Sequence, residues 1–522
     1  VCEASEQSTN WFCVLNVICS ALFKKPAFSN VIATGLILAA DGTKISESKG
    51  NFVDPTELFN QYGCDALRLY LTSSTAAHGV ALKFNIDDVS DISKRLNQLY
   101  NVYKFFLEHA IMFNTEGNTF SPHDYQKSNN VMDKWILARV SELTGKIKRY
   151  MDAFIIYKPY HEINIFIEDV ANWYVKFNRI RMKGRNISKD EQGACLSTCW
   201  NVLITLSKLL APFAPFISET FYQYMKCLLP ENEQCESVHL CNFPNENQYS
   251  RDIDIERKMS RLQHVAGIVR NLRATSKRHT SIKMPIDNIT VFVNDEKYIN
   301  DIKMVQQLLI EDSNCFTINY AMLEGLVSYS VKPDPKLIGQ RFRDKANDIK
   351  RSISQLTYND IQPFIDGKTD KLLITIDSVT YELEKDCVTP VVNLNYKPKD
   401  DEMAKLDNGV LVIGNFGHTD KIIKNYTKSL FIRAVQDMRK GTKLHSWNKI
   451  GIYYKTDNKQ LLELLNEFHN DISQNLQYEI KDILSKPMEE QVIVHKDCMI
   501  NDSHVEITIT DATGEFLKTH NE

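Results

Sequence analysis

The sequence lacks several features that would place it in a special class of protein. Its 12 cysteines form no CxxC pair and no knuckle spacing, so neither a zinc site nor a disulfide framework is indicated. No apolar run approaches the roughly 20 residues of a membrane-spanning helix, and nothing at the start resembles a signal peptide. Dispersed thiols in such a chain are typical of a cytoplasmic protein, and we expect no membrane partner.

An excess of positive charge is also missing. The chain has 62 Lys plus Arg against 66 Asp plus Glu, a formal net charge of -4 at pH 7. Such a balance gives no global basic field, so any contact with nucleic acid must come from local basic patches.

The chain is long enough for several domains. Its 522 residues predict about three or four, each with its own core. Apolar residues at helical spacing in 11–23, followed by a short run at 31–40 that suits a buried strand, are typical of the end of an α/β sheet domain. An exposed loop at 41–55 and a helix at about 55–73 come next.

From about 88 to 230 the pattern is almost entirely amphipathic helix, which predicts an all-α bundle. The expected helices are 92–113, 130–153, 157–183, 189–212 and 214–229. Beyond residue 244, strand-like runs such as 289–294, 371–377 and 505–511 alternate with helices. We therefore expect a multidomain α/β plus α protein with domains at 1–85, 86–248, 249–335 and 336–522, the last an α+β appendage.

The loop DGTKISESKGNFVDP at 41–55 is the first candidate site. It carries Lys44, Ser46, Ser48 and Lys49 between a strand and a helix. Cationic side chains and hydroxyls on a loop at a sheet edge suit a polyphosphate, because they can approach as charge develops and withdraw afterwards. A solvated surface loop has the same composition, so composition leaves both interpretations open.

Two basic regions are candidates for RNA contact. In the expected helix 157–183, an aromatic ring and several donors gather near one end: Trp173, Lys176, Arg179, Arg181 and Lys183. Basic groups hold phosphates, and planar groups stack on unpaired bases. The alternative is a tryptophan in the bundle core with a solvated basic flank.

The second basic region is 257–283, which has eight Lys or Arg and no acidic residue. Arg270, Arg273, Lys277 and Arg278 are its candidate tRNA contacts. Such asymmetry suits contact with a phosphate backbone, and without an interleaved aromatic residue we expect no base readout. A solvated basic helix before a linker is the alternative.

The segment 11–71 resembles the class I aminoacyl-tRNA synthetases and, within them, isoleucyl-tRNA synthetase of the eukaryotic cytosolic type. The resemblance is carried by Gln7, Trp11, Phe12, Ala21, Leu22, Phe23, Asn30, Val31, Gly35, Leu36, Asp41, Gly42, Lys44, Ser46, Asn51, Asp54, Pro55 and the run Tyr62, Gly63, Asp65, Ala66, Leu67, Arg68. KISES stands where that family has KMSKS. DKWILARV (133–140), NWYVKFNRIRMKG (172–184) and LLAPFAPFISETFYQ (209–223) resemble landmarks of its helical anticodon-binding domain.

The resemblance implies ATP-dependent activation of isoleucine on a Rossmann-type sheet and transfer to tRNA(Ile), with Mg accompanying ATP and no zinc or other metal site. It assigns Lys44, Ser46, Glu47, Ser48 and Lys49 to ATP, and Glu3, Glu6, Gln7 and Trp11 to the aminoacyl-adenylate. For the C-terminal region it leaves three roles open: joining other synthetases, tuning tRNA affinity or stabilising the bundle.

The sequence departs from the family pattern at several contact positions. Ala4, Glu6, Thr9 and Asn10 stand where the family has Gly, Asp, Arg and Gly, and Ile180 replaces an arginine. Glu47 replaces the second lysine of KMSKS, which reverses the sign of the charge beside a triphosphate. The HIGH signature and the editing insertion do not occur in these residues.

These departures leave three interpretations. In the first, the chain is part of an isoleucine–tRNA ligase whose catalytic half is completed upstream. In the second, it is a degenerate paralogue that binds tRNA or a protein without charging tRNA. In the third, it is unrelated to RNA and only keeps the helical bundle. The start at Val1 raises the expectation of an incomplete chain.

Overall fold

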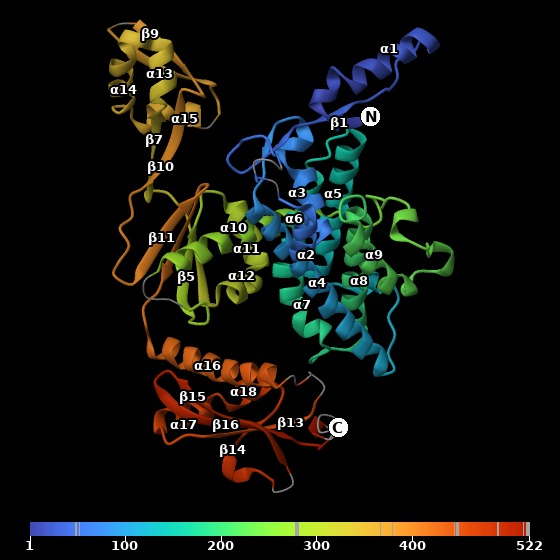
Figure 1. The fold of residues 1–522 in the computed structure, drawn as a ribbon. Helices are drawn as coiled ribbons and strands as arrows, with labels where there is room; N and C mark the ends of the chain where they lie inside the picture. Colours follow the sequence, from blue (N-terminus) through green and yellow to red (C-terminus); the bar gives the residue numbers. More distant parts are fainter. Residues whose placement is uncertain are drawn as a thin grey trace. The chain divides into compact units, whose positions relative to one another are not determined.

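The computed structural model of the chain divides into two compact units, residues 1–259 and 260–522 (Figure 1). It describes residues 1–46, 50–51, 53–276, 281–365, 367–377, 379–442, 444, 448–487, 490–514 and 516–517. The expected domains 1–85 and 86–248 fall within the first unit, which extends to Met259.

The first unit begins with short parallel strand pairs. Strand β1 (Cys2–Ala4) pairs with β2 (Ile32–Thr34), and β3 (Ile37–Leu38) pairs with β4 (Leu82–Lys83). Helix α1 (Trp11–Phe23) lies between β1 and β2 in the chain.

The expectation of a buried strand at 31–40 is wrong. The stretch forms two short strands, and Gly35 and Ala39 are its only buried residues. Several apolar side chains of the preceding helix are similarly exposed, with Val17 at 60% and Leu22 at 69%, although Phe12 is buried. The described residues supply no layer that covers these side chains. For that reason the apolar run at 31–40 is largely exposed.

Two short helices follow the loop at 41–54. Helix α2 (Pro55–Tyr62) starts where the Asp54 carboxylate accepts from the Thr56 N–H, and Pro55 at its first position costs no hydrogen bond. Gly63, with φ +88°, ends α2 and precedes α3 (Cys64–Ser73). A side chain at this φ would be strained, so glycine is what allows the two helices to follow each other directly.

The rest of the first unit is a helical bundle that agrees with the amphipathic pattern. Its main helices are α4 (Ile86–Thr115), α5 (Val131–Asp152), α6 (Pro159–Glu168), α7 (Val175–Met182), α8 (Lys189–Leu210) and α9 (Pro215–Met225). Figure 1 shows α4, α5, α8 and α9 gathered in the blue-green part of the chain. Helix α10 (Ile253–Thr275) begins in this unit and continues into the second.

Helix α8 forms the centre of the bundle. By length and composition it is apolar enough to cross a membrane, and nearly all of its apolar stretch is buried inside the structure. This helix departs from the expectation that the chain has no long apolar run. Burial on all sides explains it, because a helix surrounded by other helices needs no polar face.

The expected helix 157–183 is interrupted. Helices α6 and α7 are joined by a π-helical turn at Asp169–Tyr174. Asp169, Trp173 and Tyr174 are buried there, and the Asp169 carboxylate accepts from Arg139 Nε at 3.0 Å. Such π-helical turns are rare insertions within helices, and apolar periodicity alone does not reveal them.

The second unit is α+β, as expected from its alternating pattern. One sheet has the order β11-β12-β5-β6 and another β14-β13-β16-β15, and β10 pairs with β7 and β8 with β9. The strands are β5 (Ile286–Phe292), β6 (Cys315–Ala321), β7 (Val327–Pro333), β8 (Lys371–Ile376), β9 (Val379–Glu384), β10 (Val388–Leu394), β11 (Glu402–Asp407), β12 (Val410–Asn415), β13 (Ile450–Lys455), β14 (Ile480–Asp482), β15 (Gln491–Ile500) and β16 (Ser503–Asp511). The helices are α11 (Glu296–Met304), α12 (Gln306–Ser313), α13 (Pro335–Phe342), α14 (Ala346–Ile353), α15 (Tyr358–Ile365), α16 (Asp420–Gly441), α17 (Lys459–Glu467) and α18 (His469–Leu476).

The pairing in this unit crosses the expected boundary between 335 and 336. Strand β12 pairs with β5 and β10 pairs with β7, so residues from both sides of that boundary share ladders. Sequence order does not reveal such pairing, because the partners are about 60 to 120 residues apart in the chain.

Gly35 provides a test of the packing around β3. A Cβ at this position would lie 2.1 Å from the Val80 carbonyl oxygen, a backbone atom that cannot swing away. We expect Gly35→Ala to lower the free energy of unfolding of the first unit by about 2–3 kcal/mol, measured by urea unfolding. Gly193→Ala is the control, since a Cβ there meets Phe113 at an ordinary 3.6 Å. Equal stability of the two variants would contradict the tight contact.

Candidate functional site

The residues predicted to contact the adenylate lie on β1, a 3-10 turn at Ser5–Ser8 and the start of α1. Glu3, Glu6 and Trp11 are exposed, with Trp11 at 46%, and the Gln7 side-chain oxygen accepts from the Trp11 N–H at 3.3 Å. The Gln7 side chain thus stabilises the first turn of α1.

Neither position where a glycine is replaced has a positive φ. Ala4 is extended, with φ -67° and ψ 153°, whereas Asn10 has φ -112° and ψ -104°, outside the regular helix and strand regions. A positive φ would have made these positions dependent on glycine. The structure therefore does not require glycine at Ala4.

Asn51 ties the two ends of the loop together. Its side-chain oxygen accepts from the Ser46 N–H at 2.8 Å, and its amide donates to the Lys44 carbonyl at 3.1 Å and to Thr43 Oγ1 at 3.0 Å. These bonds fix the base of the loop, and the Lys44 side chain is exposed. Glu47, Ser48 and Lys49, also predicted for ATP, lie outside the described residues.

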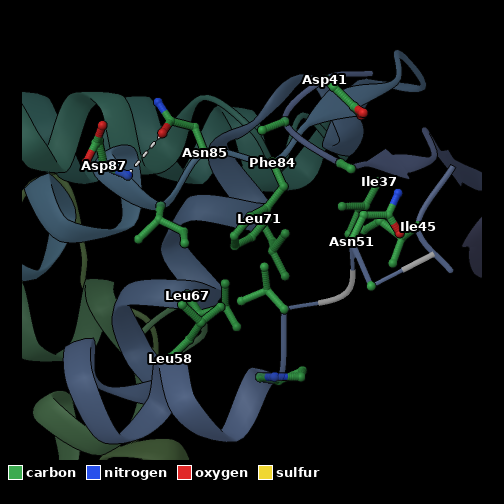
Figure 2. A pocket seen from close by; sticks show the side chains of 16 residues that line it. Ile37, Asp41, Ile45, Asn51, Leu58, Leu67, Leu71, Phe84, Asn85 and Asp87 are labelled. Atoms are coloured by element: carbon green, nitrogen blue, oxygen red, sulfur yellow. Dashed lines mark hydrogen bonds between the residues drawn. The ribbon is translucent and has the colours of Figure 1, made fainter. Parts of the chain in front are cut away.

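A cavity of about 670 Å³ lies at the base of the loop (Figure 2). Its lining is mainly apolar and comes from both ends of the loop, from α2 and α3, and from the start of α4. Figure 2 shows Ile45 and Asn51 of the loop facing Leu67 and Leu71 of α3 across this space. The loop therefore shares an apolar interior with the two helices that follow it.

The burial pattern of α7 divides its candidate tRNA residues. Val175, Asn178 and Met182 face the bundle, whereas Lys176 and Arg179 are exposed and Lys183 is half-buried. The Arg179 guanidinium lies 5.4 Å from the centre of the Phe105 ring on α4. Lys176, Arg179 and Lys183 are here called the α7 basic face.

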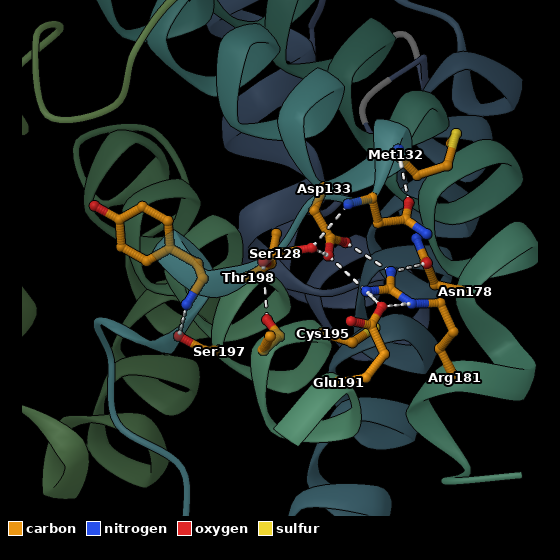
Figure 3. A network of polar contacts seen from close by, with 12 residues as sticks. Ser128, Met132, Asp133, Asn178, Arg181, Glu191, Cys195, Ser197 and Thr198 are labelled. Atoms are coloured by element: carbon orange, nitrogen blue, oxygen red, sulfur yellow. Dashed lines mark hydrogen bonds and ion pairs between the residues drawn. The ribbon is translucent and has the colours of Figure 1, made fainter. Parts of the chain in front are cut away.

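Arg181 is not on this face, and its assignment to RNA is corrected. Its guanidinium donates to both oxygens of Asp133, at 3.0 and 2.8 Å, and its Nε donates to Glu191 at 2.8 Å (Figure 3). Burial acts to lower the pKa of Arg181, but the hydrogen bonds to Asp133 outweigh it and raise the pKa above its ordinary value. Because its carboxylate partners are within the bundle, Arg181 braces α5, α7 and α8.

Asp133 is the centre of this network and is only 1% exposed. Besides Arg181, its carboxylate accepts from Ser128 Oγ at 2.5 Å and from the Tyr174 hydroxyl at 3.0 Å. A buried carboxylate needs such partners, because an unpaired one is very costly. Cys195 lies beside the network and is fully buried, so it is a packing residue.

Trp173 is also corrected. It is 3% exposed, within the π-helical turn, and its ring lies 5.9 Å from that of Phe177. A ring buried this far has no free face for a base, so the interpretation as a core tryptophan holds.

The basic region 257–283 proves to be largely paired within the protein. Arg261 donates to Asp301 at 2.9 Å, and Arg270 donates to Asp312 at 2.8 Å. Its acidic partners lie outside the segment, so counting charges along the segment overstated its attraction for phosphate.

Arg273 is fully committed to the fold, which corrects its assignment to tRNA. It is 6% exposed and donates to the carbonyls of Met284 at 2.6 Å and Ser313 at 2.7 Å. Burial lowers its pKa to about 10. Lys277 and Arg278 lie outside the described residues and stay predictions.

Sequence reasoning missed two features of the site. Phe105 supports Arg179 but lies in another helix, and no local signal announces that contact. Asp65 and Arg68 were noted only as part of the resemblance, whereas the structure shows both contacting the corner between α8 and α9.

Among the described residues, no three His, Cys, Asp or Glu side chains gather as a metal site.

Comparison with known families places these elements. The model for tRNA synthetases class I (I, L, M and V) matches residues 1–83, and that for the anticodon-binding domain of tRNA ligase matches residues 133–288. The chain belongs to the class I tRNA synthetases. The loop at 41–54 and the α7 basic face thus lie in the two parts of the chain that resemble known synthetase domains.

Relatives of this synthetase chain are cytoplasmic isoleucine–tRNA ligases. The Dictyostelium discoideum protein of that description is 31% identical over 486 residues, 92% of this chain and 45% of the relative. The Arabidopsis thaliana protein is 30% identical, covering 87% and 38%, and the Mus musculus protein 27%, covering 98% and 41%. The chain spans less than half the length of these relatives.

The buried network of this synthetase chain is testable through stability. Arg181→Met leaves Asp133 without its cationic partner, so we expect a loss of about 3–5 kcal/mol in the free energy of unfolding of the first unit, measured in urea. The double variant Arg181→Met, Asp133→Asn should lose less free energy of unfolding than the two single variants added together. We expect a difference of at least about 1 kcal/mol, because the two side chains interact directly.

Arg149→Met is the matched control, because Arg149 is 68% exposed and its carboxylate partner lies 3.9 Å away. Its effect should stay within about 0.5 kcal/mol. If Arg181→Met kept full stability but lost affinity for tRNA, Arg181 would be a contact to RNA rather than a structural residue.

Proposed function

We propose that this chain is the tRNA-binding portion, with a KMSKS-like loop, of a cytoplasmic isoleucine–tRNA ligase that activates isoleucine with ATP and transfers it to tRNA(Ile). The observation that carries the proposal is the α7 basic face, exposed on a bundle that matches an anticodon-binding domain. The names of the relatives support isoleucine as the amino acid.

The α7 basic face has the chemistry that an anticodon loop requires. Lys176 and Lys183 supply ammonium groups for phosphates, and Arg179 presents a planar cation braced by Phe105. A guanidinium beside a ring can stack on an unpaired base or bind a phosphate with two donors. These residues would hold and orient the RNA rather than react with it.

The loop at 41–54 would serve the triphosphate of ATP. Asn51 holds the loop base, so the exposed Lys44 ammonium can meet phosphate oxygens while the backbone stays in place. Mg would accompany ATP through its phosphates. Glu3, Glu6, Gln7 and Trp11 at the start of the first unit would contact the aminoacyl-adenylate.

One sequence feature favours a second function. Glu47 places a negative charge where the family has a lysine, which opposes binding of a triphosphate. A paralogue that holds tRNA, or a protein partner, without charging it would tolerate this residue.

Removing the α7 basic face tests tRNA binding. Lys176→Ala, Arg179→Ala and Lys183→Ala together should weaken binding of a tRNA(Ile) transcript by about 10- to 100-fold and reduce the slope of log affinity against log salt by about 2, because fewer counterions are released. The control removes three exposed lysines elsewhere on the first unit: Lys94, Lys127 and Lys148. An equal effect of both triple variants would show that only net charge matters.

Adding a cation at Ile180 tests the same surface in the opposite direction. It is 60% exposed beside Arg179 and stands where the family has an arginine. Ile180→Arg should strengthen binding by about 3- to 10-fold and steepen the salt dependence by about 1. Unchanged affinity would remove this position from the interface.

Isoleucine-dependent ATP–pyrophosphate exchange by the full-length gene product tests the enzyme itself. We expect measurable exchange that falls by about 100-fold in Lys44→Ala, because a cation facing the phosphates is lost. Glu47→Lys should raise exchange by about tenfold as repulsion becomes attraction. Lys94→Ala, on an exposed turn of α4, is the control. No exchange by folded protein that still binds tRNA would favour the second function.

A further inference from the structure

Two cysteines meet in the loop that follows α9. Cys235 and Cys241 are free and half-buried. The Cys235 thiol donates to the carbonyl of Leu240 at 3.6 Å, and the Cys241 thiol donates back to the carbonyl of Ser237 at 3.8 Å. The two thiols also lie within hydrogen-bond reach of each other. Each thiol thus faces the other across the loop, and we call Cys235 and Cys241 the thiol pair.

Tyr222 of α9 contacts both members of the thiol pair. Its side chain is fully buried, and its hydroxyl accepts from the Cys235 N–H at 2.9 Å. Burial raises the pKa of Tyr222, and a hydrogen bond with the Cys241 side chain raises it further. A hydroxyl in this place can donate to a thiolate as its charge develops.

The segment between the two cysteines is fixed to α9. The Glu219 carboxylate accepts from Ser237 Oγ and from the Val238 N–H, both at 2.9 Å. The Gln223 side chain donates to the Glu236 carbonyl at 2.6 Å, and Val238 is 2% exposed. The two thiols are therefore held together before any bond forms between them. Such preorganisation favours reaction within the pair over reaction with a thiol of another molecule.

Other cysteines of the bundle have a different setting. Cys195 and Cys199 lie one turn apart on α8 but are fully buried, so an oxidant dissolved in water does not reach them. Cys227, just past the end of α9, is exposed, and its thiol donates to the Tyr224 carbonyl at 3.7 Å. The thiol pair combines access from solvent with a partner thiol at hand.

We infer that the thiol pair is a reversible oxidation site, at which a peroxide converts Cys235 and Cys241 into a disulfide and a dithiol reductant restores the two thiols. Tyr222 is a positioning residue in this site. Neither tRNA nor ATP takes part, so the site does not depend on the proposed function.

The two cysteines have different roles in the reaction. Burial raises the pKa of the Cys241 thiol, the hydrogen bond with Tyr222 opposes this rise, and the Cys235 side chain adds to it. A thiol with a raised pKa is a poor nucleophile at neutral pH, because little of it is ionised. We therefore assign the first attack to Cys235 and the second to Cys241.

The atoms and electrons of this reaction balance. The Cys235 sulfur attacks one oxygen of hydrogen peroxide, the O–O bond breaks, and the products are a sulfenic acid and one water molecule. The Cys241 sulfur then attacks the Cys235 sulfur, the S–O bond breaks, and a second water molecule leaves. Two thiols and one peroxide thus give one disulfide and two waters, and the cysteines lose two electrons to the peroxide.

Peptide mapping by mass spectrometry tests the site in the whole folded chain, treated with hydrogen peroxide and digested without reduction. A link between Cys235 and Cys241 should form at least about tenfold faster than Cys227 is oxidised, because the two thiols are held together. Dithiothreitol should remove the link. In Cys241→Ser the sulfenic acid on Cys235 should persist and react with dimedone, since the second thiol is missing.

Cys227→Ser is the matched control, because it removes a neighbouring exposed thiol, and it should leave the rate of the link unchanged. Tyr222→Phe removes only the hydroxyl and should slow the link by about 3- to 10-fold, because the hydrogen bonds to Cys235 and Cys241 are lost. If Tyr222→Phe does not fold, Glu219→Gln replaces it. This variant weakens the hold on Ser237 and Val238 and should also slow the link.

Three results would overturn the inference. The first is oxidation of Cys235 and Cys241 no faster than that of Cys227. The second is a set of disulfides formed mainly between different molecules, and the third is conversion of both cysteines to sulfinic acids without a link between them. Each result leaves the proposed binding of tRNA untouched, since that binding is measured separately.

Discussion

The first unit depends on one buried carboxylate. Asp133 on α5 accepts from Ser128 before the helix, from Tyr174 in the π-helical turn and from Arg181 on α7. These partners come from separate segments of the chain, so the carboxylate fixes how they meet. Because a buried charge is tolerated only when its partners are all present, this site selects one arrangement of the helices.

That arrangement decides which side chains of α7 face outward. With Arg181 drawn inward, α7 turns Lys176 and Arg179 outward and Val175 and Asn178 inward. The same contacts bind α7 to the start of α8, whose other end meets Asp65 and Arg68. Helix α7 thus carries one set of side chains that holds the bundle together and a different set that is proposed to bind RNA.

The sequence was informative wherever the deciding interactions are local. Apolar spacing located the helices 130–153 and 189–212 to within a few residues of α5 and α8, and the helix expected from about residue 55 begins at Pro55 as α2. It failed where partners are distant. Arg273 and Arg181 look like free cations along the chain, but each donates to an acceptor 40 or 48 residues away, Ser313 for Arg273 and Asp133 for Arg181. The π-helical turn was likewise invisible to a pattern with a period of 3.6 residues.

The composition of α8 has a consequence for how the protein is made. A helix apolar enough to span a membrane is safe in water only once its neighbours surround it. One of them, α9, follows it in the chain, as does Tyr249, whose hydroxyl donates to Asn201 of α8 at 3.0 Å. During synthesis α8 leaves the ribosome before these covers exist. The apolar surface of α8 that α9 covers in the folded bundle therefore stays exposed until α9 has been made.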